Sequence, residues 1–190
     1  MLRLFFLAFV LPMALVLAGC SRPAVNTLEA PAAALRGAPA YVYAVDLSLG
    51  PAARKEVAAS DAKVLAKAAP GYAGMPLATL LPRLFKDGAA ARGMREGRAL
   101  TFVVELDHLR VPAAGGSLAG RRDRLAGLVR VVDSRTGESL AAFYVDVNQH
   151  YPGLVGLIVR EANGGVRERL ASAFVRHALD QIAPPAASRR

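Results

Sequence analysis

This chain of 190 residues has one cysteine and no tryptophan. A single cysteine excludes an internal disulfide framework and a multi-cysteine metal cluster. Acidic residues are also scarce, since 15 Asp and Glu stand against 24 Lys and Arg, a formal charge of +9. Hydrophobic residues make up 54% of the chain, which excludes disorder throughout because disordered chains are poor in apolar residues.

No apolar run is long enough for a membrane-spanning helix. The most apolar segment extends from Leu4 to Gly19, contains Pro12 and follows the positive charge of Arg3. A spanning helix needs about 20 apolar residues. A charged start, a short apolar core and small residues before a cleavage point are instead typical of a secretory signal. We therefore interpret residues 1–19 as a signal peptide rather than a transmembrane anchor.

The end of this segment resembles that of a known class of proteins. Leu17-Ala18-Gly19-Cys20 is similar to the lipobox of bacterial lipoproteins and contains the sole cysteine. The resemblance implies cleavage before Cys20, a diacylglycerol thioether on its sulfur and N-acylation, whereas the alternative is a buried cysteine in an ordinary signal. Ser21 follows instead of Asp, which in this family indicates sorting to the outer membrane. Three acyl chains would anchor the protein firmly, since one myristoyl chain alone binds marginally.

The rest of the chain divides into a tether, one domain and a tail. Residues 20–39 contain three prolines and no apolar periodicity, which predicts a flexible tether. Residues 184–190 resemble a disordered basic tail. Between them, residues 40–183 are enough for a single core.

Apolar periodicity predicts an α+β domain with two layers, in which an antiparallel sheet of about four strands packs on helices. Alternation predicts strands, and a spacing of three or four residues predicts helices. A polar turn over 133–138 predicts a hairpin, and Asn163 is a candidate N-cap for the last helix. The expected strands are 41–47, 102–107, 125–132 and 140–147, and the expected helices are 57–68, 77 to about 96, and the segment from 166 to 182.

This order of elements resembles small lipoproteins of proteobacterial envelopes. The similar part extends roughly from Arg98 to Ile182, with Val131-Val132-Asp133-Ser134-Arg135-Thr136-Gly137-Glu138 at the hairpin. These families have no agreed activity. The resemblance therefore implies a fold and a location in the bacterial envelope, and no chemistry.

Catalytic patterns are weak. The three histidines, His108, His150 and His177, form no metal-ligand spacing with each other or with Cys20. Glu105 and Asp107 share one predicted strand face, roughly 7 Å apart, and paired carboxylates can serve glycoside hydrolysis. The alternative is a solvated sheet face on which these acids pair with arginines of neighbouring strands. We favour the latter and expect no catalytic residues, no metal site and no cofactor.

Two segments are candidates for binding. Arg121, Arg122 and Arg124 follow each other closely, and guanidinium groups suit phosphates and carboxylates. In the envelope, the available anions are lipid headgroups and cell-wall polymers rather than nucleic acid. The second segment, 151–159, is an apolar connection that packs either on its own domain or on a partner. Its candidate partner-binding residues are Tyr151, Leu154, Val155, Leu157 and Ile158.

These observations predict a lipoprotein of the outer membrane, held by lipids in its inner leaflet and facing the periplasm. Its expected role is non-catalytic binding or scaffolding, with an envelope protein or an anionic envelope polymer as partner. The alternative function is a periplasmic hydrolase that acts on a cell-wall polymer through Glu105 and Asp107.

Overall fold

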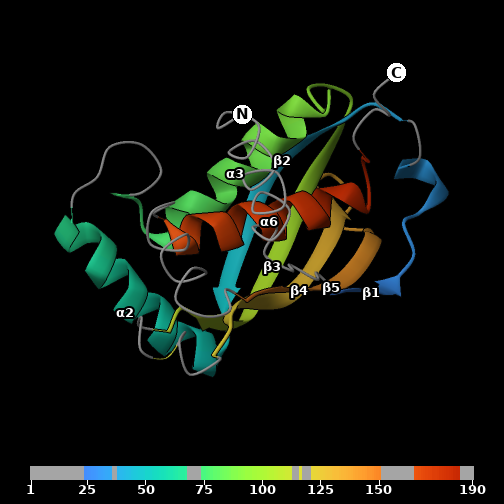
Figure 1. Ribbon diagram of the computed structural model, residues 1–190. Coiled ribbons are helices and arrows are strands. Elements are labelled where there is room, and N and C mark those ends of the chain that lie inside the picture. Colours follow the sequence, from blue (N-terminus) through green and yellow to red (C-terminus); the bar gives the residue numbers. More distant parts are fainter. Residues whose placement is uncertain are drawn as a thin grey trace, which may run out of the picture.

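The computed structural model describes residues 24–35, 38–67, 74–112, 116, 121–150 and 165–184, with the backbone alone at 34 and 64–67. Five strands form one sheet in the order β1-β5-β4-β3-β2 (Figure 1). The strands are β1 (Ala24–Glu29), β2 (Ala40–Leu49), β3 (Arg98–Arg110), β4 (Asp123–Asp133) and β5 (Ser139–Gln149). The helices are α2 (Pro51–Lys67), α3 (Leu77–Ala91) and α6 (Val166–Asp180), with a short 3-10 helix, η1 (Ala33–Leu35).

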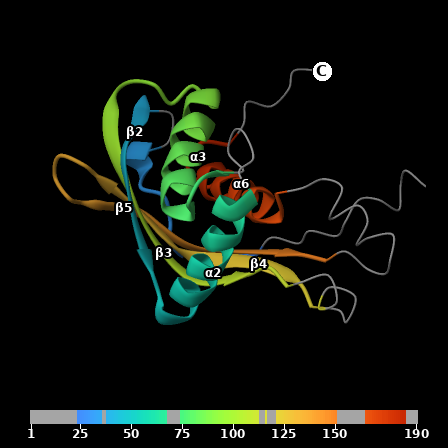
Figure 2. The same cartoon turned by 90° about the vertical axis from the view of Figure 1, so that its left-hand side faces the viewer.

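The two-layer α+β architecture agrees with the sequence prediction. Figure 2 shows α3 and α6 together on one side of the sheet, and the core lies between them and the strands. The predicted stripe of α3 supplies buried Leu77, Leu80, Leu81 and Phe85, and the Phe85 ring lies 4.8 Å from that of Phe102 on β3. Alternation along most of β3, β4 and β5 places their buried apolar side chains mainly on this same face.

The sheet is mixed rather than antiparallel, which corrects one prediction. β2 pairs with β3 in parallel, whereas β3, β4, β5 and β1 pair in antiparallel fashion. The chain between β2 and β3 contains α2 and α3. A connection that contains helices can return the chain to the starting end of the sheet, as parallel pairing requires.

The predicted tether is wrong where the structure describes it. Residues 24–29 form β1, which pairs with β5 at the edge of the sheet, from Ala24 opposite Asp146 to Glu29 opposite Ala142. Leu35 of η1 is 6% exposed and belongs to the core. Residues 24–29 therefore belong to the domain, and its described part has five strands. Most β1 side chains are exposed, which explains why its apolar periodicity is weak.

The predicted hairpin is present, and local chemistry explains its turn. The Asp133 Oδ1 atom accepts hydrogen bonds from the backbone N–H groups of Arg135 (2.8 Å) and Thr136 (3.2 Å). These bonds stabilise the carboxylate and hold the pKa of Asp133 below its usual value. Gly137 has φ +74°, a left-handed conformation that glycine adopts without strain.

The last helix covers the sheet with the predicted face. Leu170, Phe174 and Ala178 are fully buried, whereas Ser172 and Arg176 are exposed. α6 packs on β4 and β5 and lies beside α3. The residue that precedes its first turn is Gly165, at φ 52° and ψ 46°, rather than Asn163, which lies outside the described residues. The neighbouring helix α3 ends at Ala91, earlier than predicted, and contains Pro82 in its interior.

Candidate functional site: a basic groove at one end of the sheet

One end of the sheet carries a groove of about 440 Å³. It lies where β2 ends and α2 begins, beside the end of β3 and the start of β4. These segments meet because β2 and β3 are parallel and β4 runs antiparallel to them. The residues that line the groove are Pro51, Ala52, Lys55, Glu56, His108, Leu109, Arg110 and Arg124.

An irregularity in β3 shapes the groove. The pairing of β3 with β4 shifts register between Leu106 and His108, so the strict alternation of the strand is broken there. Leu106 and Leu109 are buried while His108 is exposed. Gly127 makes this geometry possible, because a Cβ atom there would lie 2.3 Å from the Glu105 carbonyl oxygen. Bulges of this kind re-aim side chains, here His108 into the groove.

The turn from β2 into α2 forms the opposite wall of the groove. The backbone N–H of Gly50 donates a hydrogen bond to the Leu106 carbonyl (2.8 Å), which joins the end of β2 to β3. Pro51 then begins α2, at a position where its missing N–H costs no helical hydrogen bond. Ala53 and Val57 pack in the core and leave Lys55 and Glu56 exposed. The first turn of α2 contains no acidic residue.

The charges of the groove are mostly basic, but one arginine is already paired. The Arg124 guanidinium donates two hydrogen bonds to Asp146, from Nε at 3.0 Å and from Nη2 at 2.7 Å. This bidentate contact raises the pKa of Arg124. Asp146 also accepts a hydrogen bond from the Asn148 side chain at 2.8 Å. Lys55 and Arg110 are therefore better placed than Arg124 to meet an external anion.

The structure separates the three predicted anion-binding arginines. Arg121 and Arg122 are exposed, and the Arg122 carbonyl accepts a hydrogen bond from Arg110 Nε at 3.3 Å. Arg110 thus lies beside this pair, whereas Arg124 is bound to Asp146. The sequence did not indicate Lys55, because only the fold brings α2 next to β3 and β4. An anion-binding role for Arg121, Arg122 and Arg124 remains a prediction.

Glu105 and Asp107 lie outside this groove. Glu105 is exposed in β3 opposite Leu128, and Asp107 falls within the register shift. Asp107 interacts with Tyr144 of β5: burial first, and then the charge and hydrogen bond of Asp107, raise the pKa of the Tyr144 hydroxyl. The predicted pair therefore belongs to the sheet surface, with one member bound to a tyrosine.

The histidines do not converge. His108 lines the groove, His150 follows β5, and His177 lies on α6. Burial, followed by the charge of Arg176, lowers the pKa of His177. Within the described part of the chain, no group of three or more His, Cys, Asp or Glu side chains could hold a metal ion.

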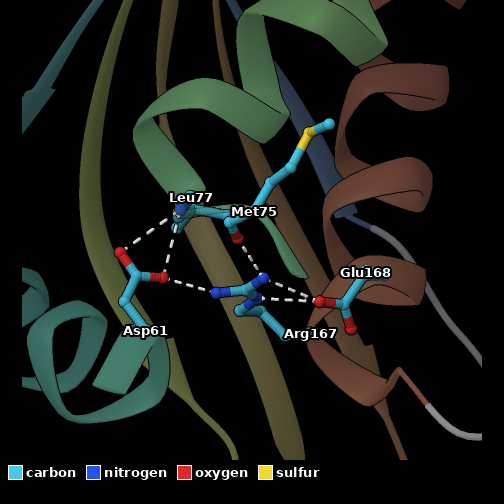
Figure 3. A network of polar contacts seen from close by, with 5 residues as sticks. All are labelled: Asp61, Met75, Leu77, Arg167 and Glu168. Atoms are coloured by element: carbon cyan, nitrogen blue, oxygen red, sulfur yellow. Dashed lines mark hydrogen bonds and ion pairs between the residues drawn. The ribbon is translucent and has the colours of Figure 1, made fainter. Parts of the chain in front are cut away.

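A buried polar network, which no sequence pattern predicts, joins α2, α3 and α6 (Figure 3). Arg167, at the start of α6, is 3% exposed and forms ion pairs with Asp61 of α2 and with Glu168 at 2.7 Å. It also donates a hydrogen bond to the Met75 carbonyl. Asp61 accepts a hydrogen bond from the Leu77 N–H at 3.1 Å, at the first residue of α3. The network is a structural clamp rather than an open site.

Other predicted residues lie outside the described part of the chain. They are Cys20, Tyr151, Leu154, Val155, Leu157 and Ile158. Their predicted roles in lipidation and partner binding remain predictions. No helix in the described ranges is both long and apolar enough to cross a membrane.

No known family model matches the chain, and no curated protein matches its sequence. Solved structures share a distant likeness in fold. A variant of the PelC dodecamer from Paraburkholderia phytofirmans aligns over 85% of this chain and 98% of its own, with 10% identity and a TM-score of 0.48. A candidate lipoprotein from Caulobacter crescentus aligns over 73% of this chain and 87% of its own, with 16% identity and a TM-score of 0.34.

Proposed function

We propose that this chain is a lipid-anchored protein of the bacterial envelope, whose domain has a non-catalytic binding or scaffolding role. The observation that supports this most is the position of Leu17-Ala18-Gly19-Cys20, four residues before the first strand residue, Ala24. A lipoprotein signal ends where the mature protein begins. A folded domain that starts just after the cysteine fits that processing.

The basic groove supports the binding part of the proposal. Lys55 and Arg110 can donate hydrogen bonds and positive charge to an anion, and His108 lines the same groove, while Glu56 is the acid among the lining residues. Phosphate and carboxylate groups are the ligands that such side chains bind best. Phosphate and carboxylate groups both occur among the anionic headgroups and cell-wall polymers of the envelope. The role proposed here needs no bond-making step.

Labelling with palmitate tests the anchor. Wild-type protein should incorporate the label and lose residues 1–19, whereas Cys20→Ser should remain an unlabelled precursor. Ser21→Ala, one residue further on, is the matched control and should be labelled and cleaved like the wild type. Incorporation of palmitate into Cys20→Ser would refute the proposal.

The membrane of residence needs a separate experiment. The absence of Asp after Cys20 supports sorting to the outer membrane. Ser21→Asp should then shift the lipidated protein to the inner-membrane fraction, while Ser21→Ala should leave it in the outer-membrane fraction. Equal distributions for the two variants would remove the support for outer-membrane sorting.

A further inference from the structure

Ala24, the first described residue after the proposed lipidation site Cys20, lies at the same end of the sheet as the basic groove. Ala24, the first residue of β1, is opposite Asp146 of β5, which is opposite Ala126 of β4, which is opposite His108 of β3. These four residues form one row across the sheet. Three strand intervals of about 4.8 Å separate the ends of the row, which places His108 roughly 14 Å from Ala24.

The start of β1 lies toward the groove end of the sheet. β1 runs antiparallel to β5, so Ala24 lies toward the end of the sheet at which β5 reaches Gln149. Arg124 and Arg110 lie opposite each other at that same end. Cys20 precedes Ala24 by four residues, which span at most about 14 Å when fully extended. Lipids on Cys20 would therefore hold this end of the domain close to the membrane.

The exposed charges at this end are predominantly positive. Lys55, Arg110, Arg121 and Arg122 are all exposed, and we call these four residues the basic end. The nearby acids are largely occupied or covered, since Asp146 is paired with Arg124 and Asp123 is 2% exposed. Glu56 is the exposed acid of the groove. A cluster of basic side chains at a bilayer is attracted by anionic headgroups.

The opposite end of the sheet is different. There, the hairpin between β4 and β5 projects away from the helices (Figure 2). Its charges are mixed and partly paired: Arg98 lies 3.6 Å from Asp133, and the Ser139 hydroxyl donates a hydrogen bond to Glu29 at 2.6 Å. Glu138 and Arg135 are both exposed there. An electrostatic field between this domain and an anionic surface would therefore orient the basic end toward the surface.

We propose that the basic end rests on the membrane that holds the lipids of Cys20 and binds the phosphates of its anionic headgroups. This inference rests on the proposed lipid anchor. The anchor keeps the protein at the membrane, and the basic end fixes which side of the domain faces it. The hairpin end then points away from the bilayer, toward the compartment beyond.

Fluorescence quenching in vesicles tests this orientation with the full lipidated protein. Because lipid blocks the sulfur of Cys20, a cysteine introduced elsewhere can be labelled alone. Ala52→Cys places the label at the groove, and Thr136→Cys places it in the hairpin turn, both at exposed positions. In vesicles of phosphatidylethanolamine and phosphatidylglycerol that contain a headgroup quencher, we expect strong quenching at residue 52 and little at residue 136.

Charge variants identify the cause of the orientation. Each basic residue near an anionic surface strengthens binding about fivefold. The triple variant Arg110→Gln, Arg121→Gln and Arg122→Gln should therefore shift the equilibrium toward undocked domains by roughly 100-fold and remove the quenching at residue 52. The matched control Arg95→Gln, Arg130→Gln and Arg135→Gln removes three exposed arginines elsewhere and should keep the quenching. About 1 M salt should also abolish quenching, since it shortens the screening length to about 3 Å.

Several outcomes would overturn the inference. Equal quenching at residues 52 and 136 would show that the domain has no preferred orientation. Quenching at residue 52 that is as strong in neutral phosphatidylcholine vesicles as in anionic vesicles would show that headgroup charge does not orient the domain. Competition by millimolar inorganic phosphate would assign the groove to a free anion instead. Failure of the anchor gives a different result. Protein that carries no palmitate label and does not enter vesicles would refute the proposed function. Lipidated protein that enters vesicles in random orientation would refute only the proposed docking of the basic end.

Discussion

Arg167 and the arginines of the basic end differ in what surrounds the same guanidinium group. Arg167 is 3% exposed and is enclosed by two carboxylates and a backbone carbonyl that come from three different segments. Arg110, Arg121 and Arg122 are exposed at strand ends. The buried group has its hydrogen bonds supplied by the protein, so it stabilises one arrangement of helices. The exposed groups keep donors available for molecules outside.

This comparison shows why the net charge alone says little about binding. A buried charge is costly unless it is paired, and removal of its partner leaves an expensive isolated ion. An exposed charge is solvated, and its loss changes stability little. The +9 charge of the chain thus includes positive groups with structural roles and others that can meet an anion. Substitutions at buried and at exposed positions separate these two roles.

The largest loss in the free energy of unfolding is expected for a substitution that buries a charge in the core without a partner. Phe174 of α6 is fully buried, so Phe174→Asp removes a large apolar side chain and buries a carboxylate. The loss should be at least about 4 kcal/mol in the free energy of unfolding. Arg176→Asp, on the exposed face of the same helix, should change it by less than about 0.5 kcal/mol. Equal losses in denaturant titrations would contradict the observed orientation of α6.

The second largest loss of stability is expected in the buried polar network around Arg167. Arg167→Met keeps the apolar bulk and leaves Asp61 and Glu168 without their shared cation. We expect a loss of about 3–5 kcal/mol, because broken buried pairs leave uncompensated charges. The same variant combined with Asp61→Asn and Glu168→Gln should recover much of that loss. A loss below about 1 kcal/mol in Arg167→Met would instead resemble an exposed pair.

Local patterns made much of the fold predictable from the sequence. The α6 stripe, the hairpin and the alternation of β3 are each set by residues close in the chain, and each is present as predicted. The sequence does not predict β1, because an edge strand with mostly exposed side chains has little apolar alternation. It does not predict the parallel pairing of β2 with β3 either, because the crossover through α2 and α3 determines that pairing, and no motif within the strands does.

The site was less predictable than the fold. The adjacent Arg121 and Arg122 suggest an anion-binding segment, which remains a prediction, and neither residue lines the groove. The groove contains Lys55, which only the fold brings near Arg110. Arg167 stands at the start of α6, where no sequence pattern marks it as buried. Its partner Asp61 is 106 positions away, so no local pattern could reveal the pair. The role of a charged side chain depends on neighbours that are remote in sequence.

A smaller change in folding stability, due to His177, should depend on pH. Burial lowers the pKa of His177 below its usual 6.5, with Arg176 lowering it further and Asp180 opposing. The unfolded chain then binds a proton more readily than the folded one, so stability is complete above pH 6.5 and declines as pH falls through the folded pKa. His177→Gln should flatten this decline between about pH 7 and 5. A steeper decline in the variant would show the opposite sign of the shift.

The smallest effect returns to the basic end. The triple variant Arg110→Gln, Arg121→Gln and Arg122→Gln removes three exposed cations and, at Arg110, one hydrogen bond of 3.3 Å to a backbone carbonyl. Glutamine retains polarity and much of the side-chain length, so no buried surface is lost. We expect the free energy of unfolding to change by less than about 1 kcal/mol in denaturant titrations, in contrast to Arg167→Met. A loss as large as that of Arg167→Met would show that these arginines hold the fold together, and the distinction between buried and exposed arginines would fail. An unchanged stability combined with lost vesicle quenching would assign them to the surface they face.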